Sequence, residues 1–332
     1  MSVKRKQDHI ELALQSRIGS IKKDDRFHYE PLLQPHPENI LKPFQFLDKT
    51  MRVPIWVSSM TGGTEYAGII NKNLARACNE FGMGMGLGSC RTLLEDNTYF
   101  DHFNLRHIIG NDQPFYANLG IVQVEKALKD NQTDRIVEII NQTKTDGLII
   151  HVNPIQEWLQ PEGDHLEVPP IETISNFLDK VKIKIIVKEV GQGIGPKSLK
   201  ALLKLNLEAI EFSAFGGTNF AKVELLRSNP IVHQMFEPLS LVGEDAYEML
   251  DMVNHFVDNG NEINVKHLII SGGIHNFLDG YYFIKKSKIP AIYGQASEFL
   301  KYARGNYENL KEYVQYQIEG LKLANAYFSI KE

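Results

Sequence analysis

The sequence predicts an α/β protein: a single (β/α)8 TIM barrel with an N-terminal helical arm and a C-terminal helix. Three observations predict this class: eight short apolar segments typical of buried strands, helical apolar periodicity between them, and Gly or polar residues after the strands. Such alternation over about 250 residues is typical of this barrel. A doubly wound open sheet alternates in the same way. The count of eight, and the lack of Gly-x-Gly-x-x-Gly after the first strand, favour the barrel.

Residues 1–51 are expected to form an N-terminal arm and an irregular connection. Residues 4–16 carry apolar side chains at helical spacing behind a cationic start, which is usual for a solvated, frayed terminus. The alternative is an arm that closes over an anionic ligand, with Arg5 and Lys6 reaching phosphate and His9 one turn behind; spacing alone favours the frayed terminus. Residues 26–51 are rich in Pro and polar groups, which predicts a long irregular connection.

The barrel is expected to occupy residues 52–332. Helical periodicity is clearest at 67–81, 172–181 and 245–257, and a long helix is predicted at 308–328. The eight strands are predicted, in chain order, at 53–58, 83–87, 114–119, 146–153, 184–190, 209–213, 267–270 and 291–293.

The composition indicates which kinds of binding partner and which cellular compartment to expect. A net charge of -5 gives no general electrostatic reason to bind nucleic acid or an anionic membrane. No apolar run approaches the length of a membrane span, and the N-terminus has no signal-peptide core. Cys78 and Cys90 are too few for a disulfide framework or a four-Cys zinc site. We therefore expect a cytoplasmic protein without nucleic-acid or membrane partners.

The stretch from 146 to 164 is the densest in potential chemistry. His151 and Asn153 would share one face of the predicted strand because strand side chains alternate, and Gln156 and Glu157 would follow in the loop. The stretch is either a polar cluster at the mouth of a binding site or an ordinary loop facing solvent. Loops that follow buried strands carry function disproportionately often, which favours the first interpretation.

Polar residues at other strand ends are expected to converge on the same mouth, because active sites of this barrel lie at the C-terminal ends of its strands. A single such residue often only satisfies loop backbone, but that explanation is much weaker for a whole set. The set is Thr61, Ser89, Asn118, His151, Asn153, Gln156, Lys188, Ser213 and Thr218.

Lys188 stands out because it ends an apolar run, where an ammonium must find a partner or lose its proton. A buried Lys in a barrel serves as a Schiff base, as half of a salt bridge, or as a cation beside an anionic cofactor. Glu189 is a poor partner because adjacent strand residues point to opposite faces. The Schiff-base and cofactor uses both stay open.

Glycines follow the seventh and eighth predicted strands, at Gly272, Gly273 and Gly294. Many barrels bind phosphate at these two strand ends through backbone N–H groups, and glycine permits close approach of the backbone. A phosphate site is therefore expected, for a phosphorylated substrate or for flavin mononucleotide (FMN).

Further motifs accompany these residues along the chain from Arg5 to Ala296. The most specific are Arg5-Lys6, Met60-Thr61-Gly62-Gly63, and Gln156-Glu157 followed by Gln160-Pro161-Glu162-Gly163. Together they resemble type 2 isopentenyl-diphosphate isomerase, the FMN-dependent form. The others are Gly88-Ser89-x-Arg91, Asn118-Leu119-Gly120, His151-x-Asn153, Lys188-Glu189-Val190-Gly191, Gly216-Gly217-Thr218 and Ser271-Gly272-Gly273.

The resemblance implies a 1,3-proton shift that interconverts isopentenyl diphosphate and dimethylallyl diphosphate, with Mg²⁺ and with FMN reduced, typically by NADPH. It also implies a homo-oligomer, a tetramer or an octamer. The implied FMN contacts are Met60, Thr61, Gly62, Ser89, Asn118, Lys188, Ser213, Thr218, Gly272, Gly273, Ile274, Gly294, Gln295 and Ala296.

The resemblance further implies that Glu157 binds Mg²⁺ and that catalysis involves Gln156, His151 and Lys188. Gln156 would reach the hydrocarbon end of the substrate, and because an amide is a poor acid it would orient or relay while the flavin moves the protons. The implied contacts of the substrate, mostly at its diphosphate end, are Arg5, Lys6, His9, Ser89, Arg91, His151, Asn153 and Gln156.

Two other functions stay in view. One is an FMN-dependent barrel oxidoreductase of the α-hydroxy-acid oxidase or dihydroorotate dehydrogenase type, which binds carboxylate substrates and needs no metal at Glu157. The other is a non-catalytic barrel that binds a phosphate ligand. Departures from the usual pattern occur at Cys90, at Ser213-Ala214-Phe215 and at Tyr293-Gly294-Gln295. Cys90 is expected to be a small buried residue, since alkene isomerisation needs no nucleophile.

Overall fold

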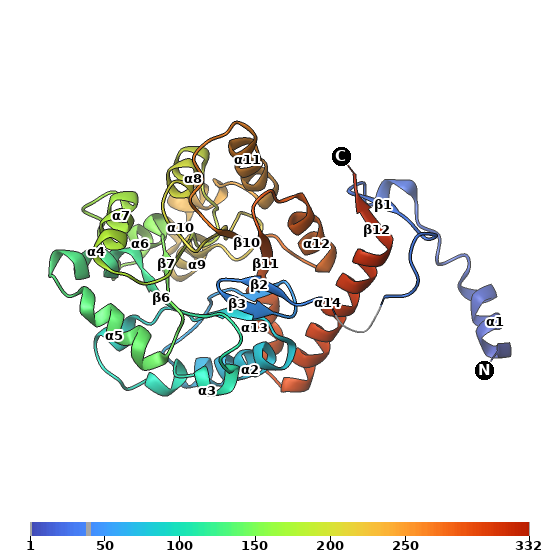
Figure 1. Cartoon of the computed structure of the whole chain (residues 1–332), viewed down its shortest axis with the longest axis horizontal. Coiled ribbons are helices and arrows are strands. Elements are labelled where there is room, and N and C mark those ends of the chain that lie inside the picture. The colour runs from blue at the N-terminus through green and yellow to red at the C-terminus, as the bar shows by residue number, and fades with distance from the viewer. Residues whose placement is uncertain (1, 38–40, 332) are drawn as a thin grey trace.

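A closed barrel of eight parallel strands forms the centre of the structure, a computed structural model that describes residues 2–37 and 41–331 (Figure 1). Each of the eight predicted strands is present, which confirms the fold class. Around the barrel the order is β10 (His267–Ser271), β11 (Ala291–Gln295), β4 (Ile55–Val57), β5 (Gly84–Gly86), β6 (Phe115–Gly120), β7 (Leu148–His151), β8 (Ile185–Lys188) and β9 (Ala209–Glu211).

Helices surround the barrel, and several begin or end at residues that cap helices well. Thr64 caps α2 by accepting from the N–H of Ala67, and Gly82 ends the same helix in the left-handed conformation. The helices are α2 (Glu65–Phe81), α3 (Arg106–Ile109), α4 (Ile121–Lys129), α5 (Thr133–Thr143), α6 (Pro154–Leu159), α7 (Pro170–Lys180), α8 (Pro196–Leu203), α9 (Phe220–Arg227), α10 (Pro230–Phe236), α11 (Ala246–Asp258), α12 (Phe277–Lys286), α13 (Ser297–Ala303) and α14 (Tyr307–Tyr327).

The segment before the barrel holds more regular structure than its sequence predicts. Helix α1 (Ser2–Leu12) stands away from the barrel (Figure 1), as a frayed terminus would. The connection expected to be irregular contains β1 (Phe27–Tyr29), which pairs with β12 (Phe328–Ile330) beyond the final helix. It also contains a hairpin of β2 (Phe44–Phe46) and β3 (Lys49–Met51).

This hairpin was missed because its strands have three residues each and its turn lacks the usual Asn-Gly or Asp-Gly. Leu47 and Asp48 form the turn with φ of 52° and 60°, conformations that L-residues rarely adopt. Burial compensates for this, because Leu47 is fully buried in the floor of the barrel.

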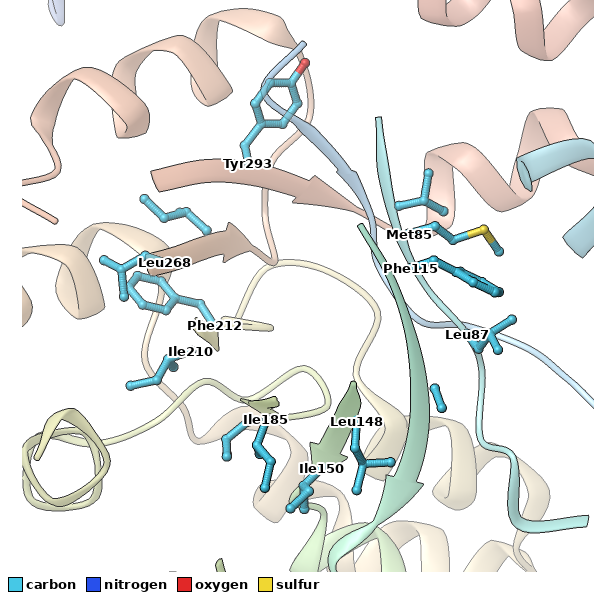
Figure 2. Close-up of a cluster of buried hydrophobic side chains, with 14 of the residues drawn as sticks. Met85, Leu87, Phe115, Leu148, Ile150, Ile185, Ile210, Phe212, Leu268 and Tyr293 are labelled. Atoms are coloured by element: carbon cyan, nitrogen blue, oxygen red, sulfur yellow. The ribbon is translucent and has the colours of Figure 1, made fainter. Parts of the chain in front are cut away.

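The barrel interior has an apolar floor. Side chains from alternate strand positions pack with the tip of the hairpin, while the positions between them face the surrounding helices. The inner cluster consists of Phe46, Leu47, Met51, Trp56, Tyr116, Ile149, Ile186, Ala209, Ile269 and Ile292. Figure 2 shows outward-facing residues, among them Met85, Ile150, Ile210 and Tyr293, which join the strands to the helical layer. The floor leaves the C-terminal mouth as the place for polar chemistry.

Within the part of the chain that the structure describes, no helix combines the length and the apolar character needed to cross a membrane.

Candidate active site at the C-terminal mouth

Three polar side chains stand side by side just above the apolar floor. His151 on β7, Lys188 on β8 and Glu211 on β9 are register partners across neighbouring parallel strands. Each lies two positions after a residue of the floor and therefore points inward, since strand side chains alternate. The two basic groups were predicted from the sequence, and Glu211 was not.

His151 is held in one tautomer by Asn118. The amide nitrogen of Asn118 donates to the Leu87 carbonyl at 3.0 Å, which turns its oxygen toward His151. The Nδ1–H of His151 then donates to that oxygen at 2.7 Å. Nε2 of the neutral ring is consequently an acceptor. Burial, and then the charge of Lys188, lower the pKa of His151 to about 3.

This lowered pKa predicts that the protein loses stability in mild acid. A histidine in the unfolded chain has a pKa of about 6.5. Between about pH 6.5 and about pH 3, His151 therefore binds a proton in the unfolded chain and stays neutral in the folded chain. The contribution of His151 is complete above this window and falls by about 1.4 kcal/mol per pH unit as the pH drops through it. Urea unfolding at pH 7, 6 and 5 should show a shallower pH dependence in His151→Gln than in the unchanged protein.

His28→Gln is the control, because His28 is exposed on β1. Equal pH dependence of unfolding in the unchanged protein and in His151→Gln would contradict the neutral, partly buried imidazole.

Lys188 is buried at 5% exposure, and its Nζ donates to the backbone carbonyl of Glu189 at 2.7 Å. As expected from strand alternation, the Glu189 carboxylate turns elsewhere; its Oε2 accepts the N–H groups of Gly191, Gln192 and Gly193. Burial raises the pKa of Glu189. The ammonium of Lys188 has three protons, and the described contacts use one. The others are available to a ligand.

A pocket of about 370 Å³ opens beside Lys188 at the ends of the strands. Lys188 is the one Lys or Arg among its described lining residues. The buried hydroxyls of Ser58 and Ser59 line it and have no hydrogen-bond partner in the described chain. Predicted cofactor residues that line it are Met60, Lys188, Ser213, Thr218, Gly272, Gly273, Ile274, Gly294, Gln295 and Ala296.

Glycine is required in this pocket by the backbone. Gly272 has φ of 88°, and a Cβ there would lie 2.1 Å from the Ala214 carbonyl oxygen. Gly216 and Gly273 also have positive φ, and the loops after β9 and β10 touch through them. Ser213 adopts φ of 44° without being glycine, and its N–H donates to Ser271 Oγ at 3.0 Å. Two loops thus present backbone to the pocket, as a phosphate site requires.

The remaining predicted cofactor residues lie elsewhere at the mouth. Asn118 is behind His151, and Ser89 is exposed, with its hydroxyl accepting from the N–H of Arg91. Thr61 and Gly62 are partly buried in the loop after β4, where Thr61 packs on Gly88. None of these four lines the pocket beside Lys188.

Asn153, Gln156 and Glu157 form a hydrogen-bonded group at the start of α6. Strand β7 ends at His151, so Asn153 does not share its strand as predicted; Pro154 begins the helix at once, and Gln156 and Glu157 are helical. The amide nitrogen of Asn153 donates to Gln156 Oε1 at 3.1 Å and to Glu157 Oε1 at 3.0 Å. Its oxygen is buried with no donor in the described chain.

Glu224 on α9 completes this group and was not predicted. Its Oε1 accepts from Gln156 Nε2 at 3.2 Å and from Gln160 Nε2 at 2.9 Å, and its Oε2 accepts from Arg227 at 2.6 Å. The Gln156 amide is therefore oriented, with nitrogen toward Glu224 and oxygen toward Asn153. No local motif marks Glu224, because it meets Gln156 only through the fold.

The loop after α6 has a structural role that the sequence left uncertain. The N–H of Asp164 donates to Glu157 Oε2 at 3.1 Å, and its carboxylate lies 3.8 Å from Arg91. Glu162 pairs with Arg227. A Cβ on Gly163 would lie 1.9 Å from the Glu157 carbonyl oxygen, so the loop needs glycine there. Asp164 therefore connects Arg91 with Glu157.

Glu157 fits a single carboxylate ligand of Mg²⁺. Among the described residues no three His, Cys, Asp or Glu side chains gather in a metal cluster. Mg²⁺ commonly takes one or two protein oxygens and completes its shell with water and phosphate oxygens. The Glu157 carboxylate and the unpartnered oxygen of Asn153 are groups of this kind.

The arm residues do not join the mouth in this structure. Arg5, Lys6 and His9 are exposed on α1, which stands away from the barrel (Figure 1). Their implied contact with substrate stays a prediction. Cys90, by contrast, is fully buried as expected, and burial raises the pKa of its thiol to about 12. It is therefore unsuited to act as a nucleophile.

Fold and mouth together define a (β/α)8 barrel with a pocket at the C-terminal ends of its strands, which is the face where enzymes of this fold carry their active sites. Among solved structures, a mandelate oxidase mutant with the monooxide FMN adduct has a TM-score of 0.56 and 11% identity, covering 92% of this chain and 88% of that one. The recombinant flavin-binding domain of baker's yeast flavocytochrome b2 has a TM-score of 0.62 and 10% identity, covering 91% and 72%. These likenesses show the fold.

Sequence comparison identifies the family. Isopentenyl-diphosphate delta-isomerase of Rickettsia akari (strain Hartford) is 32% identical over 328 residues, which cover 97% of this chain and 92% of the relative. The enzyme of the same name from Rickettsia africae (strain ESF-5) is 34% identical over 332 residues, with the same coverage. No protein-family model matches the chain. The chain belongs to the isopentenyl-diphosphate delta-isomerase family.

Proposed function

We propose that the protein interconverts isopentenyl diphosphate and dimethylallyl diphosphate as the type 2, FMN-dependent form of the enzyme. Membership of the family supports the reaction. The observation that carries the type 2 assignment is the glycine pocket beside a buried Lys188, joined at one mouth to the Asn153, Gln156 and Glu157 group.

The pocket beside Lys188 suits FMN. Backbone of the glycine loops would hold the phosphate, and the unpartnered hydroxyls of Ser58 and Ser59 would meet polar groups of the cofactor. Lys188 would face the pyrimidine edge of the ring, where reduced flavin carries negative charge. When bound and reduced, by NADPH in our proposal, FMN supplies an electron-rich ring able to exchange protons with the substrate. This use of Lys188 is favoured over a Schiff base.

The diphosphate end of the substrate would lie toward Arg91, His151 and Asn153. Arg91 offers a fork of N–H donors to phosphate oxygens, and Mg²⁺ on Glu157 would neutralise further charge. Nε2 of His151 is an acceptor until the ring gains a proton, so binding of an anion there should draw one from solvent.

Gln156 would position the hydrocarbon end and does not act as the acid. Its amide is held between Asn153 and Glu224, and a neutral amide does not give up a proton to an alkene at neutral pH. A second cavity, of about 700 Å³, borders Asn153 and Gln156 and has mostly apolar walls, among them Ile155 and Ile194. Apolar surroundings of this kind suit a carbon skeleton.

The proposal is tested by loading the purified protein with FMN and following isopentenyl diphosphate by proton NMR. Turnover should require reduced FMN and Mg²⁺, and should fall to background with oxidised FMN or with chelator. Turnover by flavin-free protein would contradict the type 2 assignment. Oxidation of a 2-hydroxy acid, without isomerisation, would instead support the FMN oxidoreductase. Phosphate-ligand binding without either reaction would support the non-catalytic barrel.

The setting of the enzyme is also a proposal. We expect a cytoplasmic homo-oligomer, a tetramer or an octamer, without nucleic-acid or membrane partners. In such an assembly the exposed arm with Arg5, Lys6 and His9 would contribute to substrate binding.

A further inference from the structure

Glu211 carries a buried carboxylate oxygen that nothing in the described chain satisfies. The residue ends β9 and is fully buried, at 0% exposure. Its Oε1 accepts a hydrogen bond from Ser271 Oγ at 3.3 Å, and its Oε2 has no partner. An unpartnered charged oxygen in the protein interior costs several kcal/mol of folding free energy unless a nearby positive charge compensates it. Such an exception calls for an explanation.

The positive charge nearest in the sheet is Lys188. Glu211 and Lys188 are direct register partners on β9 and β8, and neighbouring strands lie about 4.8 Å apart. On its other side Glu211 faces Ile269, and two residues below it is Ala209, so neither neighbour offers a donor. The ammonium of Lys188 is bonded to the Glu189 carbonyl and is turned toward the pocket. The two charges therefore share the wall of the barrel without a direct hydrogen bond.

Glu211 is also linked to the pocket by a short chain of hydrogen bonds. Ser271 Oγ donates to Glu211 and accepts the N–H of Ser213, the residue with φ of 44°. Ser213 and Ser271 both line the pocket, and Glu211 lies behind them. If Glu211 had a structural role alone, it would serve only to accept the hydrogen bond of Ser271.

We propose that the Glu211 carboxylate is a counter-charge to Lys188, and a positioning residue that sets how strongly the pocket stabilises negative charge on the bound flavin. The inference rests on the proposed function, since it requires FMN in this pocket. A carboxylate behind the ammonium offsets part of its attraction for an anionic ring. The balance between oxidised and reduced FMN then depends on Glu211, although Glu211 touches neither cofactor nor substrate.

The test is the midpoint potential of the FMN-loaded protein, measured with a reference dye. Glu211→Gln keeps the shape and the Ser271 bond and removes the charge. Among groups in the wall of the barrel, where the effective dielectric constant is about 20, removal of one charge should change the ratio of reduced to oxidised flavin about tenfold. The potential should therefore become more positive by about 30 mV. Glu208→Gln is the control, because it removes a carboxylate at the start of the same strand, where Glu208 pairs with Lys266. It should leave the potential close to that of the unchanged protein.

Three results for these two variants would overturn the inference: an unchanged potential in Glu211→Gln, a shift to more negative values in Glu211→Gln, or an equal shift in Glu208→Gln. Glu211→Asp moves the charge without removing it. Its potential should shift less than that of Glu211→Gln, in either direction. If Glu211→Gln does not fold, a shift of 30 mV or more in Glu211→Asp would contradict the role of net charge. Failure of the unchanged protein to bind FMN would refute the proposed function itself. That outcome is distinct, because it is read before any variant is made.

Discussion

Lys188→Ala should weaken FMN binding about 10–100-fold and reduce isomerisation at least as much. Hydrogen bonds to a charged group contribute about 1.5–3 kcal/mol, and Lys188 is the one Lys or Arg among the described lining residues of the pocket. Loss of the ammonium also removes the charge that stabilises an anionic ring. The dissociation constant is measured by quenching of FMN fluorescence during titration of flavin-free protein.

Lys184→Ala is the matched control, because Lys184 lies just before the same strand but pairs with Asp48 at the opposite end of the barrel. It should keep its affinity for FMN. If Lys188→Ala kept normal flavin content and a normal rate, its proposed contact with FMN would be wrong.

Glu224→Ala should lower kcat about 10²-fold while FMN affinity stays within about twofold of the unchanged protein. Glu224 holds the nitrogen of Gln156 at 3.2 Å, and without it the amide is free to turn away from the carbon skeleton. Misplacement of about 1 Å at a reacting centre costs on the order of 10²-fold in rate. Steady-state kinetics with isopentenyl diphosphate and FMN titration provide the two measurements.

Glu162→Gln separates orientation of Gln156 from general disturbance of the loop. Glu162 shares Arg227 with Glu224 but does not contact Gln156. Its kcat should stay close to that of the unchanged protein. Equal losses in Glu162→Gln and Glu224→Ala would show that the loop matters and that orientation of Gln156 by Glu224 does not.

The barrel could be predicted because parallel strands buried on both faces appear as continuous apolar runs, as 148–150 and 185–187 do. Most residues that line the pocket could be predicted from the ends of the strands, because this fold brings the C-terminal ends of its strands to one mouth. The boundary after β7 was wrong: Pro154 begins a helix, so Asn153 and Gln156 are presented by α6.

Two carboxylates could not be predicted from local sequence. Glu211 ends a strand but resembles any polar residue there, and its significance depends on its register with Lys188. Glu224 is 68 residues from Gln156 and meets it only when α9 packs on α6. The hairpin at 44–51 was missed for a related reason, since its turn is stabilised by burial of Leu47 in the barrel floor. Long-range packing decided each of these cases.

The central proposal is that FMN, when reduced and held in the Lys188 pocket, would supply the proton exchange of the reaction, and that an amide side chain would not. It is tested most directly by replacing FMN with an analogue that has carbon in place of N5, and following isopentenyl diphosphate by proton NMR under reducing conditions with Mg²⁺. The account predicts that the analogue binds with an affinity close to that of FMN and supports no turnover. Full turnover with the bound analogue would contradict it.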